Sequence, residues 1–293
     1  MSRKGSITYQ IKNELLSKCK FGESRDEAKK NGTAYKYIYS YGTLNTYMKQ
    51  LNYMVKWARN NKIKLKNIDD IAAHGDEWLQ YCLDQDMSAW TLTTRRAAIC
   101  KLCNLPYSHF KTKIPIRTRS SVKRSRNKSL ALKHFSEEKN PDQVIFCKCT
   151  GLRASELSAI TGDRLYFNNK KPFLHVTEKT KGGRPREVEL YGSPQEINKC
   201  IQLCKEAGKN KVFEKVKENA NTHGYRSDYA KRVYFSNARS IDEINDRNEI
   251  MFCRKDKKGI VYDKNALKIC SENLGHSRID IVSTSYLYEN DAA

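Results

Sequence analysis

The stretch Cys149–Ile160, "CTGLRASELSAI", places an arginine in a segment whose spacing predicts a helix packed against a core. Leu157 and Ile160 follow Arg153 by four and seven positions and therefore share one helical face with it. A guanidinium on an inward face must reach water, pair with a carboxylate such as Glu156, or meet an external anion. We expect Arg153 to border a cleft that receives an anion, rather than to be part of a buried salt bridge.

The composition indicates what kind of partner that anion belongs to. The chain of 293 residues carries 55 Lys and Arg against 33 Asp and Glu, a formal net charge of +22. A surplus of this size bears on partners rather than on fold, and it makes a polyanion the leading candidate. With 39% apolar residues, the chain can build the core of one large domain or two ordinary ones.

Neither a membrane span nor a metal site is expected. The N-terminal residues carry charges throughout, and no apolar run approaches the length that crosses a bilayer, so we expect a cytoplasmic protein. Ten cysteines without a signal peptide are typical of reduced thiols. Structural zinc is the alternative, but Cys100 and Cys103 fall within one helical pattern and Cys200 and Cys204 within another.

The first half of the chain divides by pattern into two parts. Residues 1–39 form a polar N-terminal segment, in which a short helix precedes a loop at "FGESRDEAKKNG". Residues 40–110 predict a small helical domain, because apolar residues recur at helical spacing in "TLNTYMKQLNYMVKWARN", "DEWLQYCLDQD" and "SAWTLTTRRAAICKLCNL". Asn60 and Asn61 are expected to end the first of these helices.

Residues 111–134 form a strongly basic linker. As far as Lys133 it contains nine Lys or Arg residues, one proline and no acid. Such a run is either a solvated stretch that keeps the chain soluble, or a strap that contacts phosphates while two domains close around a duplex. The residues predicted to contact DNA are Lys123, Arg124 and Arg126 in the linker and Arg95 and Arg96 in the preceding helix.

Residues 135–293 predict a second domain of helices around a small sheet. Gly151 is expected to end one helix before the opening stretch begins. The following "RLYFNNKKPFLHVTEKTKGGRPREVEL" alternates apolar and polar residues, with turn signals at Asn168-Asn169 and Gly182-Gly183. The fold class is therefore α+β and mostly helical, with a three-stranded antiparallel sheet, and helices follow the sheet.

A histidine and an arginine are expected at the start of one later helix, "NTHGYRSDYAKRVYF". Asn221 or Thr222 is its N-cap, so His223 and Arg226 project from the positive end of the helix, where an anion binds readily. The alternative is structural: the histidine caps the helix and the arginine pairs with Asp228 or another acid.

The last segment, "NLGHSRIDIVSTSYLYEN", holds a second histidine and a tyrosine. Gly275 fits a helix C-terminus, and Ser277 with Asp280 fits a capping box, which leaves His276 in the junction. Tyr286 follows ten residues later in a helix, where a tyrosine is more often part of the core.

These residues matter more as a set than singly. Two arginines, two histidines, a tyrosine and Lys181, which lies at a hairpin tip, are the groups needed to bind a phosphodiester and attack it with a phenol. A tyrosine with a pKa near 10 is a poor nucleophile at neutral pH, so the cations must offset the developing charge. No cluster of carboxylates for a metal accompanies them.

The ordered set resembles the catalytic domain of the tyrosine recombinases, the phage-integrase family. The resemblance rests on "TGLRASEL", the lysine in "EKTKGGRPREV", "HGYR" and "LGHSRIDIVSTSYLY", and the helical residues 40–110 are similar to that family's core-binding domain. The family needs neither metal nor another cofactor, and it acts on double-stranded DNA. The resemblance thus implies DNA recombination.

The resemblance implies how a phosphate would be held. Arg153 and Arg226 would clamp the non-bridging oxygens of the scissile phosphate, with Glu156 orienting Arg153. His276 would donate a hydrogen bond to the phosphate in the transition state. The family's leucine and histidine on either side of the second arginine are replaced here by Tyr225 and Ser227, a change that bears on packing rather than chemistry.

It also implies the chemical roles. Tyr286 would attack phosphorus and form a 3′-phosphotyrosyl bond, Lys181 would protonate the departing 5′ oxygen, and His223 would take part in proton transfer at the nucleophile. The spacing before the tyrosine is one residue longer than is common in the family, which leaves Tyr288 as an alternative nucleophile, and Lys179 is the alternative lysine.

The implied function is site-specific cutting and rejoining of DNA, in the integration or excision of a mobile element, by a homotetramer on paired sites. A chromosome-resolving recombinase and a type IB topoisomerase share this chemistry. A non-catalytic DNA-binding protein on the same scaffold is the alternative from another class, and the filled catalytic positions argue against it.

Overall fold

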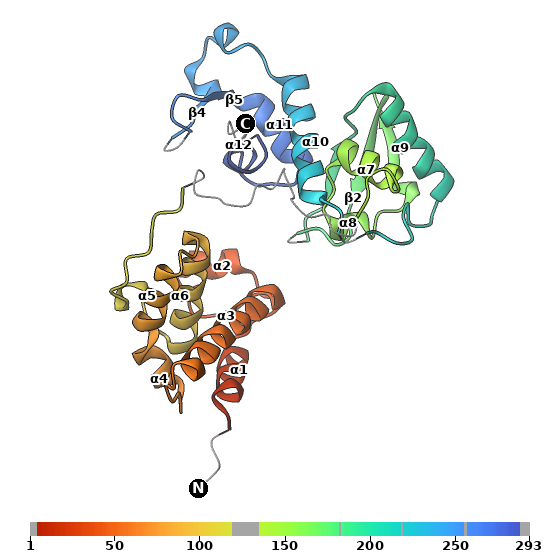
Figure 1. Ribbon diagram of the computed structural model, residues 1–293. Helices are drawn as coiled ribbons and strands as arrows, with labels where there is room; N and C mark the ends of the chain where they lie inside the picture. Colours follow the sequence, from red (N-terminus) through yellow and green to blue (C-terminus); the bar gives the residue numbers. More distant parts are fainter. Residues whose placement is uncertain (1–4, 119–134, 182, 218, 255–256, 288–293) are drawn as a thin grey trace. The chain divides into compact units, whose positions relative to one another are not determined.

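The computed structural model describes residues 5–118, 135–181, 183–217, 219–254 and 257–287 (Figure 1). The chain separates into two compact units, residues 1–123 and 124–293. The proposed DNA contacts Lys123, Arg124 and Arg126, and the alternative nucleophile Tyr288, lie outside the described residues. Within the described ranges, no helix is long and apolar enough to cross a membrane.

The regular elements in the described part of the first unit are all helices. Its α-helices are α1 (Ile7–Ser17), α2 (Arg25–Lys30), α3 (Tyr41–Asn60), α4 (Ile68–Ala73), α5 (Gly75–Asp84) and α6 (Ala89–Cys103), with the 3₁₀ turn η1 (Tyr107–His109). Serine side chains cap several of them: Ser40 accepts a hydrogen bond from the backbone at the start of α3, and Ser88 does so for α6. Helix α3 packs against α1 and α6 around a core that includes Leu51, Met54 and Leu92.

The N-terminal segment contributes more to this unit than its polar composition predicts. Ile7, Ile11 and Leu15 recur every four residues in α1, and all three are buried in the unit's core. This narrow apolar stripe is enough to pack a helix whose other positions are mostly polar. The predicted loop "FGESRDEAKKNG" also differs from the structure, because Ser24 caps the short helix α2 within it.

The first residues of the predicted linker are attached to the helical unit. The carboxylate of Asp76 accepts hydrogen bonds from the backbone N–H groups of Lys111 and Thr112, at 3.0 and 2.9 Å. The Thr112 hydroxyl donates to the same carboxylate at 2.9 Å, and the Arg117 guanidinium donates to Thr93 Oγ1 at 3.3 Å. The segment therefore leaves the unit later than the charge pattern indicates.

The second unit consists of helices packed around a small sheet (Figure 1). Its elements are α7 (Pro141–Thr150), α8 (Ala154–Leu157), η2 (Gly162–Arg164), β1 (Leu165–Asn168), β2 (Lys171–Val176), β3 (Arg186–Glu189), α9 (Pro194–Ala207), α10 (Thr222–Asn237), η3 (Ile241–Glu243), η4 (Arg247–Glu249), β4 (Ile250–Phe252), β5 (Val261–Asp263), α11 (Lys264–Asn273) and α12 (Asp280–Ser285). Helix α7 packs against α9 and α10, and α10 against α11.

The three-stranded antiparallel meander is confirmed. Strand β2 lies between β1 and β3, with Leu174 opposite Leu165 on one side and Val188 on the other. Asn169 and Lys170 turn the chain between β1 and β2 with positive φ angles of 48° and 65°, as in tight hairpins. A second ribbon of β4 and β5 was not expected from the sequence, because its strands have three residues each.

The helix predicted around Arg153 is much shorter than expected. Gly151 ends α7 in the left-handed conformation, with φ of 58°, and this part of the prediction is confirmed. Arg153 itself is extended, with φ of −73° and ψ of 155°, and only Ala154–Leu157 form α8. Arg153 therefore precedes the helix and does not share a helical face with Leu157 and Ile160.

Candidate active site

Arg153 begins a buried ion-pair network at the start of α8. Its Nη1 lies 2.7 Å from Glu156 Oε1, and its backbone N–H donates to Glu156 Oε2 at 2.8 Å. The Glu156 side chain is fully buried, whereas that of Arg153 keeps about a fifth of its surface exposed. The expectation that no salt bridge is buried here is wrong, because the extended backbone of Arg153 turns it toward the carboxylate of the first helical turn.

A second arginine, which the sequence pattern did not single out, binds the same carboxylate. Arg186 at the start of β3 places Nη1 2.8 Å from Glu156 Oε1 and Nη2 2.7 Å from Oε2. Burial by itself would raise the pKa of Glu156, but the hydrogen bonds and charge of Arg186, followed by those of Arg153, lower this pKa to about 2. Glu156 is therefore an anion at neutral pH.

Arg226 lies in the interior near the start of α10. The side chain of Asn221 accepts a hydrogen bond from the Gly224 N–H at 3.0 Å, which confirms the predicted N-cap. The Arg226 guanidinium is 2% exposed and donates to the carbonyl oxygens of Gly151 and Leu274. Its Nε donates to Tyr286 Oη at 3.1 Å, so these partners differ from Asp228 or another acid, which the structural alternative named.

Tyr286 is held at both ends by consecutive residues of α10. It directly follows α12 and is 4% exposed. Its phenol oxygen contacts Arg226, and its backbone carbonyl accepts a hydrogen bond from Ser227 Oγ at 2.6 Å. Ser227, noted above only as a departure from the family pattern, is thus the anchor of the tyrosine's backbone.

His276 meets the same phenol from the turn after α11. Gly275 has a φ of 66° and ends the helix as predicted, and His276 Nε2 lies 3.1 Å from Tyr286 Oη. Burial, followed by the charge of Arg226 and of neighbouring cations, lowers the pKa of His276 to about 4. The ring is therefore neutral at pH 7 and can accept a hydrogen bond from the phenol.

The capping box predicted beside His276 does not form. Helix α12 starts at Asp280 after Ile279, and no side chain caps it. The junction is held instead by Ser271 of α11, whose hydroxyl contacts the carbonyl oxygens of His276 and Arg278 at 3.1 and 3.3 Å. The loop thus depends on a residue that precedes it.

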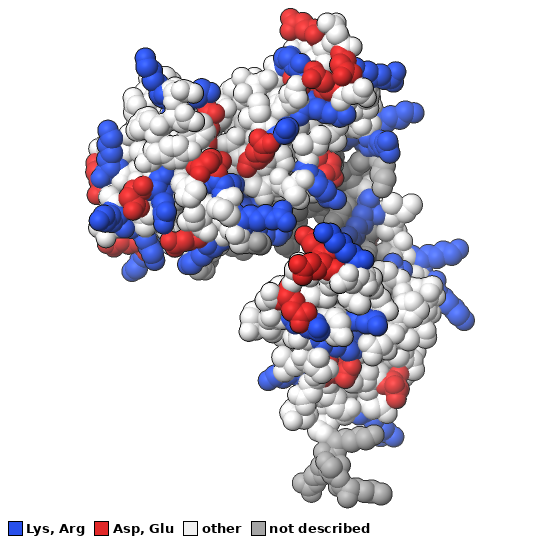
Figure 2. Space-filling model, turned by 180° about the vertical axis from the view of Figure 1, so that it is seen from behind, with Lys and Arg blue, Asp and Glu red and all other residues white. Residues whose placement is uncertain are grey.

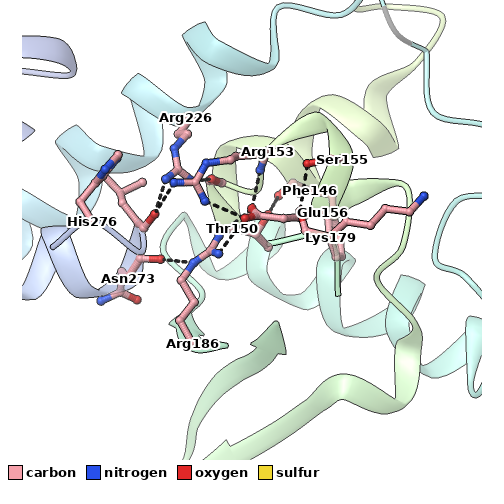
Figure 3. A network of polar contacts seen from close by, with 12 residues as sticks. Phe146, Thr150, Arg153, Ser155, Glu156, Lys179, Arg186, Arg226, Asn273 and His276 are labelled. Carbon is pink, nitrogen blue, oxygen red and sulfur yellow. Dashed lines mark hydrogen bonds and ion pairs between the residues drawn. The ribbon is translucent and has the colours of Figure 1, made fainter. Parts of the chain in front are cut away.

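The two remaining predicted residues lie at the rim. His223 is exposed in the first turn of α10, with its ring centroid 5.7 Å from that of Tyr286. Lys181 lies in the exposed loop between β2 and β3, near enough for its charge to help lower the pKa of His276. The alternative lysine, Lys179, extends away from the arginines in Figure 3 and places Nζ 3.3 Å from Ser158 Oγ.

Arg95, predicted to contact DNA, is instead part of the core of the helical unit. It is 7% exposed, and its guanidinium lies over the ring of Trp78 and donates to Cys82 Sγ at 2.7 Å. It follows Leu92 by three positions and precedes Ile99 by four, so it belongs to the inner face of α6. Arg96 stacks on the exposed ring of Tyr107 at 5.0 Å.

Basic side chains are distributed over both units. On the face seen in Figure 2, Lys and Arg are spread among fewer acidic groups. No cluster of three His, Cys, Asp or Glu that could hold a metal occurs among the described residues. The cysteines are free thiols.

Comparison with known proteins gives a likeness of fold. No protein-family model matches the chain, and no curated protein matches its sequence. The XerH site-specific recombinase bound to palindromic difH substrate, in a post-cleavage complex, matches 97% of this chain and 92% of its own with a TM-score of 0.51 and 13% identity. The Tn1549 transposon integrase in complex with transposon right end DNA gives a TM-score of 0.46 and 11% identity, over 96% of each chain. The mostly helical fold with a small antiparallel sheet is thus shared with a recombinase.

Proposed function

We propose that this protein is a site-specific tyrosine recombinase, which cuts and rejoins double-stranded DNA through a 3′-phosphotyrosyl intermediate on Tyr286. The observation that carries the proposal is the environment of the phenol oxygen, which lies 3.1 Å from both Arg226 Nε and His276 Nε2. A buried tyrosine of the core would not be expected to share its hydroxyl with a buried arginine and a neutral histidine. This arrangement suits a nucleophile beside an anion site.

The arginines would hold the scissile phosphate. A guanidinium has five N–H donors, and Arg226 uses three of them in the hydrogen bonds described above. Donors therefore remain for a non-bridging oxygen, and the partly exposed Arg153 can supply more. Charge that develops on the phosphoryl oxygens in the transition state would be stabilised by donors already in position, without further reorganisation.

The phenol would lose its proton to a neighbouring histidine. An arginine can only donate, so with His276 in the tautomer that leaves Nε2 unprotonated the hydroxyl of Tyr286 donates to His276. His276 would then be the first acceptor of the proton, and His223 lies close enough to assist. The phenol oxygen would bond to phosphorus while the bond from phosphorus to the 5′ oxygen breaks. Lys181 would protonate that leaving oxygen, and the reverse reaction would rejoin the strands.

The fold shared with XerH and the net charge of +22 support DNA as the partner. We propose that the helical unit contributes to binding, that the chain acts as a homotetramer on paired sites, and that it serves a mobile element in the cytoplasm. A test with one and two copies of the site distinguishes recombination from relaxation of the type IB topoisomerase kind, since only recombination needs the second copy.

Trapping the covalent intermediate tests the chemistry. The site is first selected from a random duplex pool, and nicked "suicide" duplexes carrying it are incubated with the protein. We expect a protein–DNA adduct that survives denaturation with the native chain and with the control Tyr288→Phe, and none with Tyr286→Phe, a loss of more than about 1,000-fold. An adduct that persists in Tyr286→Phe and disappears in Tyr288→Phe would move the nucleophile. If the native chain binds a site yet forms no adduct, the protein is a non-catalytic binder.

A further inference from the structure

Arg186 is more deeply buried than Arg153 and binds the same carboxylate through two contacts. Its side chain is 7% exposed, and it forms two parallel hydrogen bonds to the fully buried carboxylate of Glu156 (Figure 3). Two-point contacts of this kind fix both the distance and the plane of the two groups. The orientation of Glu156 is therefore set by Arg186, and Arg153 is oriented by Glu156 in turn.

The C-terminal end of α11 joins the three arginines. Arg186 Nε donates to the carbonyl oxygen of Asn273 at 2.9 Å, and the carbonyl oxygen of Leu274 accepts from both Arg153, at 3.3 Å, and Arg226. These carbonyls belong to the negative end of a ten-residue helix and are otherwise unpaired in a regular helix. One helix end therefore aligns the guanidinium groups side by side despite their like charge.

The charges explain why a second arginine is needed. If Glu156 were paired with Arg153 alone, the pair would be neutral, and the attraction of Arg153 for a phosphate would be reduced by the adjacent anion. With Arg186 included, two cations share one carboxylate, and a positive charge remains on the side where Arg153 is partly exposed.

We propose that Arg186 is a positioning residue of the phosphate clamp, which neutralises and orients Glu156 so that Arg153 stays both fixed and available to the scissile phosphate. The inference rests on the function proposed above and adds a residue to it. Arg186 need not touch DNA in this role, because it acts on Arg153 through the carboxylate that the two arginines share.

The other charged groups near Glu156 do not replace Arg186. Apart from Arg186, Arg153 is the cation in direct contact with Glu156. Other charged residues lie farther away, either around the Tyr286 phenol or along a small cavity beside the Glu156 carboxylate. These groups are Arg226, Lys181, His276, Arg164, His175 and Glu178. Without Arg186, a carboxylate buried at this position faces one cation by direct contact, and burial then favours its protonated form as the pH falls.

The test compares Arg186→Met, Arg186→Lys and a matched control, Arg232→Met, in adduct formation on the nicked duplex between pH 5 and 8.5. Arg232 also binds a glutamate through two contacts, to Glu196 at 3.0 and 2.8 Å, in the same unit but in a different network. We expect Arg186→Met to slow adduct formation by roughly 10-fold to 100-fold at pH 7.5 and to slow it further in mild acid. Arg186→Lys should be intermediate, and Arg232→Met should keep the native pH profile.

A double variant separates positioning from a general loss of stability. In Glu156→Gln no carboxylate remains to titrate, so adding Arg186→Met should cause little further loss and no new dependence on pH. Thermal unfolding of each variant gives its folded fraction, and if Arg186→Met does not fold, the pH profile of Arg186→Lys decides. An unchanged rate and profile in a folded Arg186 variant would overturn the inference, as would full additivity with Glu156→Gln. Absence of an adduct with the native chain would instead contradict the proposed function.

Discussion

Each unit buries an arginine, and the two sites differ in what surrounds it. In the helical unit, Arg95 lies over aromatic rings and contacts Cys82 and Gln50, so its charge is enclosed by neutral groups. In the second unit, Arg226 lies beside other cations, at a helix end, with a tyrosine hydroxyl on its Nε. An inward-facing arginine is thus not in itself evidence for an anion site. The gathering of several cations around one reactive group is what distinguishes the second unit.

The largest expected effect tests this contrast directly. Replacing Arg226 by methionine removes a donor aimed at the reacting centre and should lower the rate of adduct formation by at least roughly 100-fold. The matched change Arg95→Met also removes a buried guanidinium and should alter that rate by less than about twofold per folded molecule, whereas it should lower the stability of the fold. Rates from single-turnover trapping, corrected for the folded fraction, provide the comparison. Equal losses in the two variants would mean that Arg226 is structural as well.

A second prediction concerns the titration of His276. Its pKa of about 4 lies below the ordinary value near 6.5, so between these values the unfolded chain binds more protons than the folded one. The contribution of this group therefore makes the folded state less stable as the pH is lowered through that interval. The histidine ring signals in NMR spectra, assigned with His276→Gln, should show a midpoint near 4 in the free protein.

DNA should move that midpoint upward, because a phosphate offsets the charge of the arginines that disfavour the protonated ring. His175, exposed on β2 and paired with Glu187, is the internal reference in the same spectra. A midpoint near 6.5 in the free protein, or one that DNA leaves unchanged, would contradict the electrostatic description of the site.

The smallest expected effect concerns the linker. Neutralising Lys123, Arg124 and Arg126 to glutamine should weaken binding to all DNA sequences alike, since interactions with phosphates carry no sequence information. The slope of log affinity against log salt concentration should become shallower by roughly one unit for each side chain that no longer binds a phosphate. The same measurement on Arg95→Gln should show an unchanged slope because that residue is buried. An unchanged slope in the linker variant would make the segment a solvated spacer.

Local signals in the sequence were sufficient for several features of the fold. Gly151 and Asn221 mark helix ends through their own conformation and side chain. The turn predicted at Asn168-Asn169 lies one residue later, at Asn169 and Lys170, because Asn168 still pairs with Lys171 in the sheet. The fold class follows from such features. The core position of α1 was missed because three apolar side chains in a charged segment have meaning only when the rest of the core is present.

The candidate site was predictable as a set of residues and not as a network. The tyrosine, the second arginine and the second histidine lie together as expected, whereas the extended backbone at Arg153 depends on the preceding turn. Arg186 could not be recognised, because its partner Glu156 is thirty positions earlier in the chain and the pairing depends on the register of β3. Arg186 does lie in the motif "GGRPREV" that carries Lys181, but nothing in that motif indicates that it binds Glu156.

The hydrogen bond from Ser227 to the backbone of Tyr286 bears on the reaction proposed for this protein. The carbonyl is fastened in the interior at 2.6 Å, whereas the phenol is held by hydrogen bonds that a phosphate could replace. The backbone of Tyr286 is therefore fixed, and its phenol can move only by rotation about the side-chain bonds. In the proposed reaction, such a rotation would limit the nucleophile to a small arc, so the DNA strand would have to be brought to the tyrosine and the position of the duplex would determine where the strand is cut.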